Sequence, residues 1–158
     1  MSAQLTEDQE LIVQTARSFA QEKLRPNAAR WEEEGLSRET LQELASLGFG
    51  GIYVREEHGG SGLSRLDAAL IFEELSRCCI STAAFLSIHN MCSWMIDSFG
   101  NEEQRAEWLP KLVTMECDLA AGPGEPSART IAALIRPHFR CAPTAPAVVT
   151  WQMSMALA

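Results

Sequence analysis

The chain has 158 residues, 46% of them hydrophobic and 22% charged, and its formal net charge at pH 7 is -8. A chain of this length forms about one domain, and its composition excludes a disordered, collagen-like or low-complexity polypeptide. The acidic excess disfavours nucleic acid or anionic lipid as a partner, and no apolar run reaches the roughly 18 residues of a membrane span, so we expect a soluble protein.

Helical spacing of apolar residues dominates the first three-quarters of the chain. In chain order it predicts a helix from Thr6 to near Arg25, a short one over residues 28–34, one between Ser37 and Gly48, one that begins at Ser64 and includes Leu75, one over residues 82–98, and one that begins at Asn101 and includes Met115. Capping pairs mark three of the starts: Thr6 with Gln9, Ser64 with Asp67, and Asn101 with Gln104. No segment between these helices is long enough to build a sheet. The pattern therefore predicts an all-α helical bundle.

Prolines and apolar side chains set further expectations for three of these helices. Pro26 ends the first helix, and Pro110 predicts a kink or a local break in the last. The helix that begins at Ser64 is apolar around most of its circumference, which is typical of a helix buried between others. We therefore expect it to be central, with these residues packed: Leu66, Ala69, Leu70, Ile71, Phe72 and Leu75.

A glycine-rich loop, EEHGGSG at residues 56–62, precedes the helix capped by Ser64. Such glycines can bring backbone N–H groups close to a phosphate at a helix amino terminus. However, no strand leads into the loop, Arg65 stands where a third glycine is needed, and no P-loop lysine follows. These departures favour a tight turn over a phosphate site.

The histidines, carboxylates, serines and cysteines follow no spacing typical of catalysis or metal binding. His89 has only Cys92 nearby on its helix, which gives at most a two-ligand metal site, and His58 has no partner. Adjacent glutamates point about 100° apart on a helix, and no G-x-S-x-G elbow supports a serine nucleophile. The five cysteines are odd in number and lack C-x-x-C spacing, so we expect reduced, packed thiols of an intracellular protein: Cys78, Cys79, Cys92, Cys117 and Cys141.

Met91 and Met95 align with Ala84 and Ile88 along one stripe of the helix over residues 82–98. Flexible thioethers can line a pocket for an apolar ligand, whereas methionines at helical spacing more often lie in a core. The residues alone leave both interpretations open. They indicate an acidic helical domain with no visible catalytic group.

The composition changes near residue 117. Residues 1–116 hold 19 of the 21 acidic and 10 of the 13 basic residues, whereas the last 42 hold 2 and 3. Five of the seven prolines also lie in this last part, and proline at that density breaks helices and strands. We therefore expect a helical domain over residues 1–116 and a divergent, poorly ordered, Pro-rich tail over residues 117–158.

Two segments resemble the amino-terminal helical domain of acyl-CoA dehydrogenases: LGFGGIYVREEHGGSGLSRLD at residues 47–67 and STAAFLSIHNMCSWMIDSFGNEEQR at residues 81–105. The resemblance covers about residues 5–116 and is greatest to the branch that oxidises isobutyryl-CoA. It implies a flavoprotein oxidoreductase of amino-acid or fatty-acid catabolism, in which FAD oxidises the Cα–Cβ bond of an acyl-CoA thioester and electron-transferring flavoprotein reoxidises the flavin. By position, it also implies that Ala84, Ser87, Ile88 and Met91 wall the acyl-chain cavity.

The sequence departs from the family after the last predicted helix. The family enters its β domain through a segment resembling LTEPGSGSD, whereas residues 119–128 read LAAGPGEPSA. The β domain and the carboxy-terminal bundle do not follow, nor do the catalytic glutamate and most FAD contacts that the family places there. We therefore expect a truncated product of an alternative exon, a frameshift or a gene-model error, inactive by itself, without retained FAD and with no catalytic residue to assign.

Two functions compete on this basis. The chain is either a dehydrogenase fragment with weak acyl contact, or a non-catalytic interaction module that forms a homo-oligomer or docks on full-length subunits. An apolar face exposed by the missing domains would favour docking. By resemblance the compartment is the mitochondrial matrix in a eukaryote, although no transit peptide precedes the domain, or the cytoplasm in a bacterium.

Overall fold

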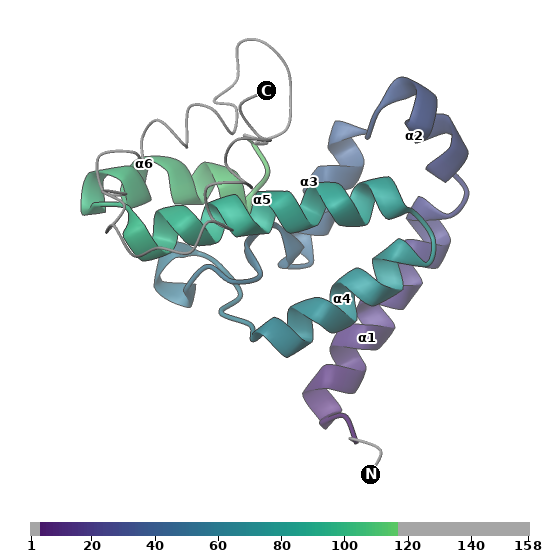
Figure 1. Ribbon diagram of the computed structural model, residues 1–158, viewed down its shortest axis with the longest axis horizontal. Coiled ribbons are helices and arrows are strands. Elements are labelled where there is room, and N and C mark those ends of the chain that lie inside the picture. Colours follow the sequence, from purple (N-terminus) through teal and green to yellow (C-terminus); the bar gives the residue numbers. More distant parts are fainter. Residues whose placement is uncertain (1–3, 117–158) are drawn as a thin grey trace, which may run out of the picture.

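The computed structural model describes residues 4–116 as an all-helical domain (Figure 1). The helices are α1 (Glu7–Phe19), the π-helical turn η1 (Ala20–Leu24), α2 (Ala28–Glu34), α3 (Arg38–Ser46), the 3-10 turns η2 (Phe49–Gly51) and η3 (Glu56–His58), α4 (Arg65–Ser76), α5 (Ile80–Phe99) and α6 (Glu102–Val113). No strand occurs between residues 4 and 116, which confirms the predicted fold class. The predicted tail over residues 117–158 lies outside the described residues.

The three predicted capping pairs are all present as reciprocal hydrogen bonds. The Thr6 hydroxyl accepts from the Gln9 backbone N–H at 3.2 Å, and the Gln9 side chain accepts from the Thr6 backbone N–H at 3.1 Å. The Ser64–Asp67 and Asn101–Gln104 pairs do the same at the starts of α4 and α6. Each box satisfies two backbone groups that a helix terminus leaves open, so these starts follow from the local sequence.

The two prolines act differently from each other. Before Pro26 the first helix widens into η1, where the Arg25 N–H donates to the Ala20 carbonyl at 2.9 Å. At Pro110 the structure shows no local break, because α6 continues without interruption to Val113, whereas the alternative expectation of a kink stays a prediction. Pro110 stands in the last turn, where its missing N–H removes one hydrogen bond, and the Thr114 N–H still reaches the Pro110 carbonyl at 3.2 Å.

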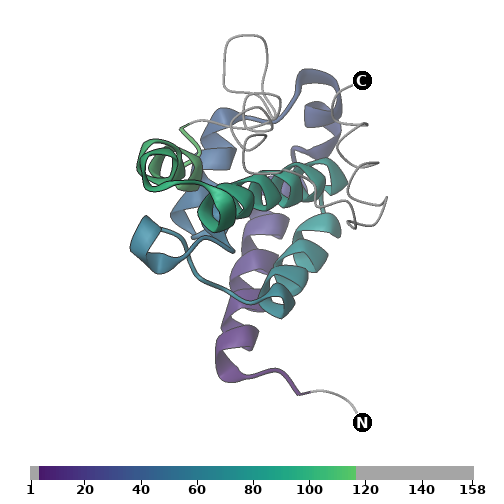
Figure 2. The ribbon, with the colours of Figure 1, turned by 60° about the vertical axis from the view of Figure 1, so that its left-hand side comes forward.

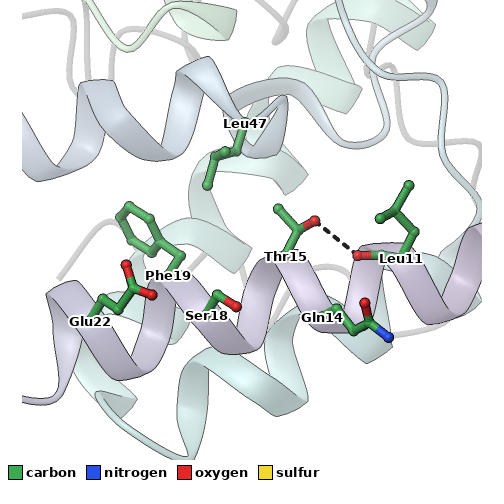
Figure 3. A pocket seen from close by; sticks show the side chains of 7 residues that line it. All are labelled: Leu11, Gln14, Thr15, Ser18, Phe19, Glu22 and Leu47. Carbon is green, nitrogen blue, oxygen red and sulfur yellow. Dashed lines mark hydrogen bonds between the residues drawn. The ribbon is translucent and has the colours of Figure 1, made fainter.

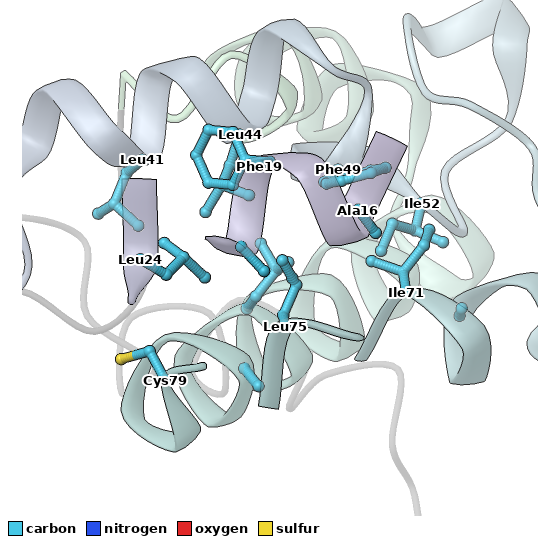
Figure 4. Close-up of a cluster of buried hydrophobic side chains, with 14 of the residues drawn as sticks. Ala16, Phe19, Leu24, Leu41, Leu44, Phe49, Ile52, Ile71, Leu75 and Cys79 are labelled. Carbon is cyan, nitrogen blue, oxygen red and sulfur yellow. The ribbon is translucent and has the colours of Figure 1, made fainter. Parts of the chain in front are cut away.

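α1 and α4 lie side by side, and α5 crosses near one end of this pair (Figures 1 and 2). Side chains from α1, α3, α4 and the residues around η2 meet between these helices to form the main core (Figure 4). Its fully buried members include Leu24, Leu44, Ile52, Ile71 and Leu75. A smaller cluster between α5 and α6 contains Val54, Cys92, Ile96, Leu109 and Leu112.

α4 is less enclosed than its apolar sequence predicts. It packs against α1 and α5 and buries Ala68, Ile71 and Leu75, but Ala69 is exposed and 56% of Leu66 is exposed. The expectation that α4 is buried between other helices is therefore met on the sides that face α1 and α5. The packing expected of Leu66 and Ala69 is wrong within residues 4–116. Two neighbouring helices cover two sides of α4, and none of the described elements covers the third.

The fold brings the η2 connector close to α6. A Cβ atom on Gly50 would lie 2.2 Å from the Val113 carbonyl oxygen, a distance that only glycine can accommodate. Among the described helices, none is long and apolar enough to cross a membrane. Within the same residues, no group of three or more His, Cys, Asp or Glu side chains is arranged to hold a metal ion.

Candidate functional site

The glycine-rich loop before α4 is a tight turn whose donors are used within the fold. The backbone N–H groups of Gly60, Ser61 and Gly62 donate to the carbonyls of Arg55, Gly51 and Val54 at 2.9–3.1 Å. The Ser61 hydroxyl donates to the Gly48 carbonyl at 2.7 Å. Because these groups already have acceptors, the loop offers no cradle for a phosphate or pyrophosphate.

α5 exposes mainly apolar side chains, together with Ser81 and Ser98, and buries several polar ones. Along with Leu86 and Ile96, its inner side buries Thr82, His89, Asn90, Ser93 and Asp97. Its outer side has exposed apolar side chains that we call the apolar face of α5: Ile80, Ala84, Ile88, Met91 and Phe99. No charged side chain lies on this outer side, because Asp97 is the only acidic residue of α5 and is buried. A helix whose outer side meets only water has the opposite pattern.

Asn90 fixes one part of α5 to the η2 connector. Its side-chain oxygen accepts from the Ile52 backbone N–H at 2.7 Å, and its amide nitrogen donates to the Phe49 carbonyl at 2.9 Å and the Leu86 carbonyl at 3.0 Å. Asn90 is fully buried, so these bonds replace water that the amide has lost. The next residue, Met91, consequently points away from the connector, toward the outer side.

Further polar contacts fix the rotation of α5 about its axis. The Asp97 carboxylate accepts from the Arg55 guanidinium at 3.1–3.2 Å and from the Arg55 backbone N–H at 3.3 Å. This hydrogen bonding raises the pKa of Arg55 above its ordinary value. The His89 Nε2–H donates to the Leu112 carbonyl at 3.0 Å, which joins α5 to the end of α6. The helix therefore cannot turn its outer side inward without breaking buried polar contacts.

The structure brings together the four residues predicted to wall an acyl chain. Ala84, Ile88 and Met91 belong to the apolar face of α5, with 48% of Ile88 and 44% of Met91 exposed. Ser87 is half-buried beside them, and its hydroxyl donates to the Ala84 carbonyl at 2.8 Å. Met95, from the same predicted stripe, is half-buried. Within the described residues Met91 is therefore not a core residue.

Sequence reasoning missed one member of this face, Ile80, and expected another, Phe99, beside the methionine stripe. These two residues stand at the two ends of α5, and 76% of Ile80 is exposed. Ile80 lies four residues before Ala84, which puts both on the same side of a helix, but the expected helix began only at Thr82. Phe99 packs edge-on against Trp94 with ring centroids 5.7 Å apart. The Arg65 guanidinium lies over the Trp94 ring at 4.7 Å and over the Tyr53 ring at 4.0 Å, at the edge of the face.

Two hollows on the described surface lie elsewhere. One of about 440 Å³ lies between α1 and the end of α3, lined by Leu11, Gln14, Thr15, Ser18, Phe19, Glu22 and Leu47 (Figure 3). Another of about 550 Å³ lies between η3 and α6, lined by Glu57, His58, Gly59, Arg105, Ala106, Pro110, Val113 and Thr114. Neither includes a residue of the predicted acyl wall, and His58 in the second lies 3.2 Å from Arg55 Nη2.

The cysteines within the described residues behave as packed thiols. Cys79 and Cys92 are buried, Cys78 is half-buried, and all three are free. Burial raises the pKa of the Cys92 thiol, which disfavours the reactive thiolate form. Cys117 and Cys141 lie outside the described residues.

Most of the described part of the chain matches a known protein family. Residues 6–116 match the family described as acyl-CoA dehydrogenase, N-terminal domain. A mitochondrial isobutyryl-CoA dehydrogenase of Dictyostelium discoideum is 57% identical over 116 residues, which are 73% of this chain and 28% of that protein. A mitochondrial isobutyryl-CoA dehydrogenase of Bos taurus is 44% identical over 140 residues, 85% of this chain and 34% of that protein.

A solved structure matches the fold as well. The butyryl-CoA dehydrogenase of Megasphaera elsdenii superimposes with a TM-score of 0.66 and 31% identity, over 81% of this chain and 36% of the other. The chain thus spans about a third of the length of the relatives it matches. A match over residues 6–116, together with the shared helical fold, identifies this chain as a member of the acyl-CoA dehydrogenase family through its amino-terminal domain.

Proposed function

We propose that residues 1–116 form the amino-terminal helical domain of an FAD-dependent acyl-CoA dehydrogenase that oxidises a short branched acyl-CoA such as isobutyryl-CoA. In the complete enzyme, the apolar face of α5 walls the acyl-chain cavity through Ala84, Ser87, Ile88 and Met91. The observation that supports this most is the pattern of α5, which buries Asn90 and Asp97 and presents uncharged, apolar side chains outward. Such a face needs an apolar partner.

The chemistry of the face suits a short branched acyl chain. Ile88 and Met91 offer methyl and thioether surfaces, and Ala84 between helix turns leaves room for a branch. Each buried methylene of the substrate would contribute roughly 0.8 kcal/mol of binding. The only hydroxyl in the set, that of Ser87, already donates to the Ala84 carbonyl, so the wall presents no free donor to an apolar chain.

FAD binding depends on residues other than those of the acyl wall. Enzymes of the family depend on FAD, which accepts the hydride when bound. The glycine-rich loop does not fit a site for it, because the donors of this loop are hydrogen-bonded within the fold. We therefore propose that residues 1–158 by themselves do not retain FAD, and we assign no catalytic base among the described residues.

The proposed partners and compartment are inferred from the relatives and the family. We propose an acyl-CoA thioester as substrate and electron-transferring flavoprotein as electron acceptor for the complete enzyme. The two relatives reported above are mitochondrial, which supports a mitochondrial matrix location if this chain comes from a eukaryote. For a bacterial source we propose the cytoplasm.

A chimeric enzyme tests the acyl wall. Residues 1–116 would replace the matching part of the Dictyostelium isobutyryl-CoA dehydrogenase, and flavin content would report folding. The chimera is expected to oxidise isobutyryl-CoA. Ala84→Phe should lower kcat/KM for isobutyryl-CoA at least about tenfold by filling the cavity. Ala29→Phe, at an exposed alanine of α2 beside charged residues, is the matched control. A folded Ala84→Phe chimera with unchanged kcat/KM would rule out the acyl wall.

The second candidate function is a non-catalytic module that docks on full-length subunits. The 76% exposure of Ile80 at the end of an uncharged helix face favours it. Untagged residues 1–158 should then co-purify with a tagged full-length enzyme. Ile88→Asp should abolish co-purification, whereas Leu11→Asp on α1 should not.

A further inference from the structure

Arg65 begins α4, and two aromatic rings hold its guanidinium at the edge of the apolar face of α5. The guanidinium carbon lies 4.0 Å from the centroid of the Tyr53 ring and 4.7 Å from that of the Trp94 ring. Trp94 in turn packs edge-on against Phe99, a member of this face. The contacts come from three separate segments, namely the connector after η2, α4 and α5, so the fold itself places the cation there.

None of the ion pairs among the described residues includes Arg65. Asp67, the nearest acidic residue in the sequence, accepts instead from the Ser64 backbone N–H at 2.9 Å, the Ser64 hydroxyl at 2.6 Å and the Gln9 side chain at 3.0 Å. Most other cations of the domain pair with a carboxylate: Arg17, Lys23, Arg30, Arg55, Arg77 and Arg105. Arg65 is thus fixed in position without an anion beside it in residues 4–116.

A guanidinium held in this way is suited to a carboxylate. The ring faces attract the cation, but they supply no oxygen acceptor for its N–H donors. These donors match the two oxygens of a carboxylate, and a side chain that is already restrained loses less conformational freedom when it pairs.

The position of Arg65 also determines what can cover this end of α5. Trp94 follows Met91 by three residues and therefore neighbours it on the helix surface, so the cation adjoins exposed apolar side chains. A segment that covers them also removes water from Arg65, and a buried cation without a partner is costly. The covering segment is therefore expected to combine apolar side chains with a carboxylate.

We propose that Arg65 binds an aspartate or glutamate side chain in the part of the complete dehydrogenase that residues 1–116 do not include. Apolar neighbours of that side chain would cover the adjoining end of the apolar face of α5. The matched region is only 28% of the Dictyostelium relative, so in that protein the domain occurs beside much further chain. This inference rests on the proposed function, because it requires residues 1–116 to be a domain of such an enzyme.

A zero-length cross-link tests the contact. The protein is the chimera proposed for the acyl wall, in which residues 1–116 replace the matching part of the Dictyostelium enzyme, with Arg65→Lys. A carbodiimide joins an amine to a carboxylate that touches it, with loss of water, and mass spectrometry identifies the two residues. The introduced amine should be joined to an aspartate or glutamate outside residues 1–116. Lys23 and Glu43, whose charged atoms lie 3.0 Å apart, are the internal positive control.

Arginine modification provides a measurement on the unchanged side chain. A dicarbonyl reagent should modify Arg65 at least about tenfold more slowly in the chimera than in the 158-residue chain, because a charge-assisted pair occupies its N–H donors. Arg25 is also exposed and is in none of the ion pairs among the described residues. It is the control, and its rate should be similar in the two proteins.

Each outcome decides the proposal. A cross-link only to a carboxylate within residues 1–116, or no cross-link while Lys23 and Glu43 are joined, would overturn it. Equal modification rates of Arg65 in the two proteins would overturn it as well. A chimera without flavin would contradict the proposed function and remove the basis of this inference. A chimera that oxidises isobutyryl-CoA but forms no cross-link at the introduced amine would contradict the Arg65 contact alone.

Discussion

Asn90 shows how a single buried side chain orients the candidate site. Its amide makes three hydrogen bonds, to Ile52, Phe49 and Leu86, and no part of it reaches solvent. Two of the three partners belong to the connector around η2, so the side chain joins that connector to α5. The rotation of α5 that exposes Ile88 and Met91 therefore depends on an amide on the opposite side of the helix.

Replacing Asn90 should destabilise the domain strongly. Asn90→Ala leaves the Ile52 N–H and the Phe49 carbonyl buried without their partner, at a cost of about 2–4 kcal/mol in the free energy of unfolding. The matched control is Asn27→Ala. The half-buried Asn27 side chain donates to the Lys23 carbonyl, and its loss should cost less than about 1 kcal/mol. Urea unfolding followed by circular dichroism measures both. Equal effects would show that Asn90 does not fix the connector.

Glu74 gives the domain an acid-sensitive contact between α1 and α4. Its buried carboxylate accepts two hydrogen bonds of 2.9 Å from the Arg17 guanidinium. These bonds hold the pKa of Glu74 below its ordinary value of 4.5, although burial opposes the shift. A lowered pKa in the folded state means that the stabilisation is present above the ordinary pKa and is lost as the pH falls through the lowered value.

Glu74→Gln should therefore lower the free energy of unfolding near neutral pH. It should also make that free energy fall less steeply as the pH is lowered. The expected decrease at pH 7 is about 1–2 kcal/mol, a modest value because Arg17 is half exposed. Below the lowered pKa the variant and the wild type should converge. Glu73→Gln, which breaks only an exposed pair with Arg77, is the control and should change little. A gap that stays constant from neutral to acid pH would contradict the assigned role.

At the scale of whole elements, the connector around η2 touches α6 through a glycine. Gly50→Ala would put a methyl group 2.2 Å from the Val113 carbonyl oxygen, so the connector or α6 must shift. The expected cost is about 1–3 kcal/mol or more in the free energy of unfolding. Gly59→Ala separates backbone strain from a steric clash. Its φ of 84° is strained for alanine, but nothing lies within 4 Å of the added Cβ atom. Thermal unfolding should rank Gly50→Ala as the less stable variant.

Local sequence predicts where these helices start far better than which way they face. The three capping boxes need only side chains three residues apart, and all three form as expected. The orientation of α5 depends instead on partners distant in sequence, the Ile52 N–H and the Arg55 guanidinium, which draw Asn90 and Asp97 inward. Periodicity therefore could not decide whether Met91 lies in the core. The widening at η1 had a visible signal, Pro26, but a proline does not specify a π-helical turn.

For the described part of the molecule, exposed apolar surface is concentrated on the outer sides of α5 and α4. The apolar face of α5, together with Leu66 and Ala69 on α4, is left open by residues 4–116 alone. Both helices keep their inner sides well packed, so the open sides are not a sign of poor folding. The differences from expectation, an exposed side of α4 and a helix without a break at Pro110, concern contacts and a last helical turn rather than the fold class.

Residues 1–158 purified as one polypeptide should be colourless and should not reduce a dye when isobutyryl-CoA is added. Proton removal needs a carboxylate within reach of the bound acyl chain. The single carboxylate of α5, Asp97, lies on the buried side and is bound to Arg55, opposite the apolar face. The absorbance of oxidised flavin near about 450 nm and dye reduction are the measurements, and the active chimera is the positive control. A yellow preparation bleached by isobutyryl-CoA would mean that this polypeptide holds flavin and a base by itself.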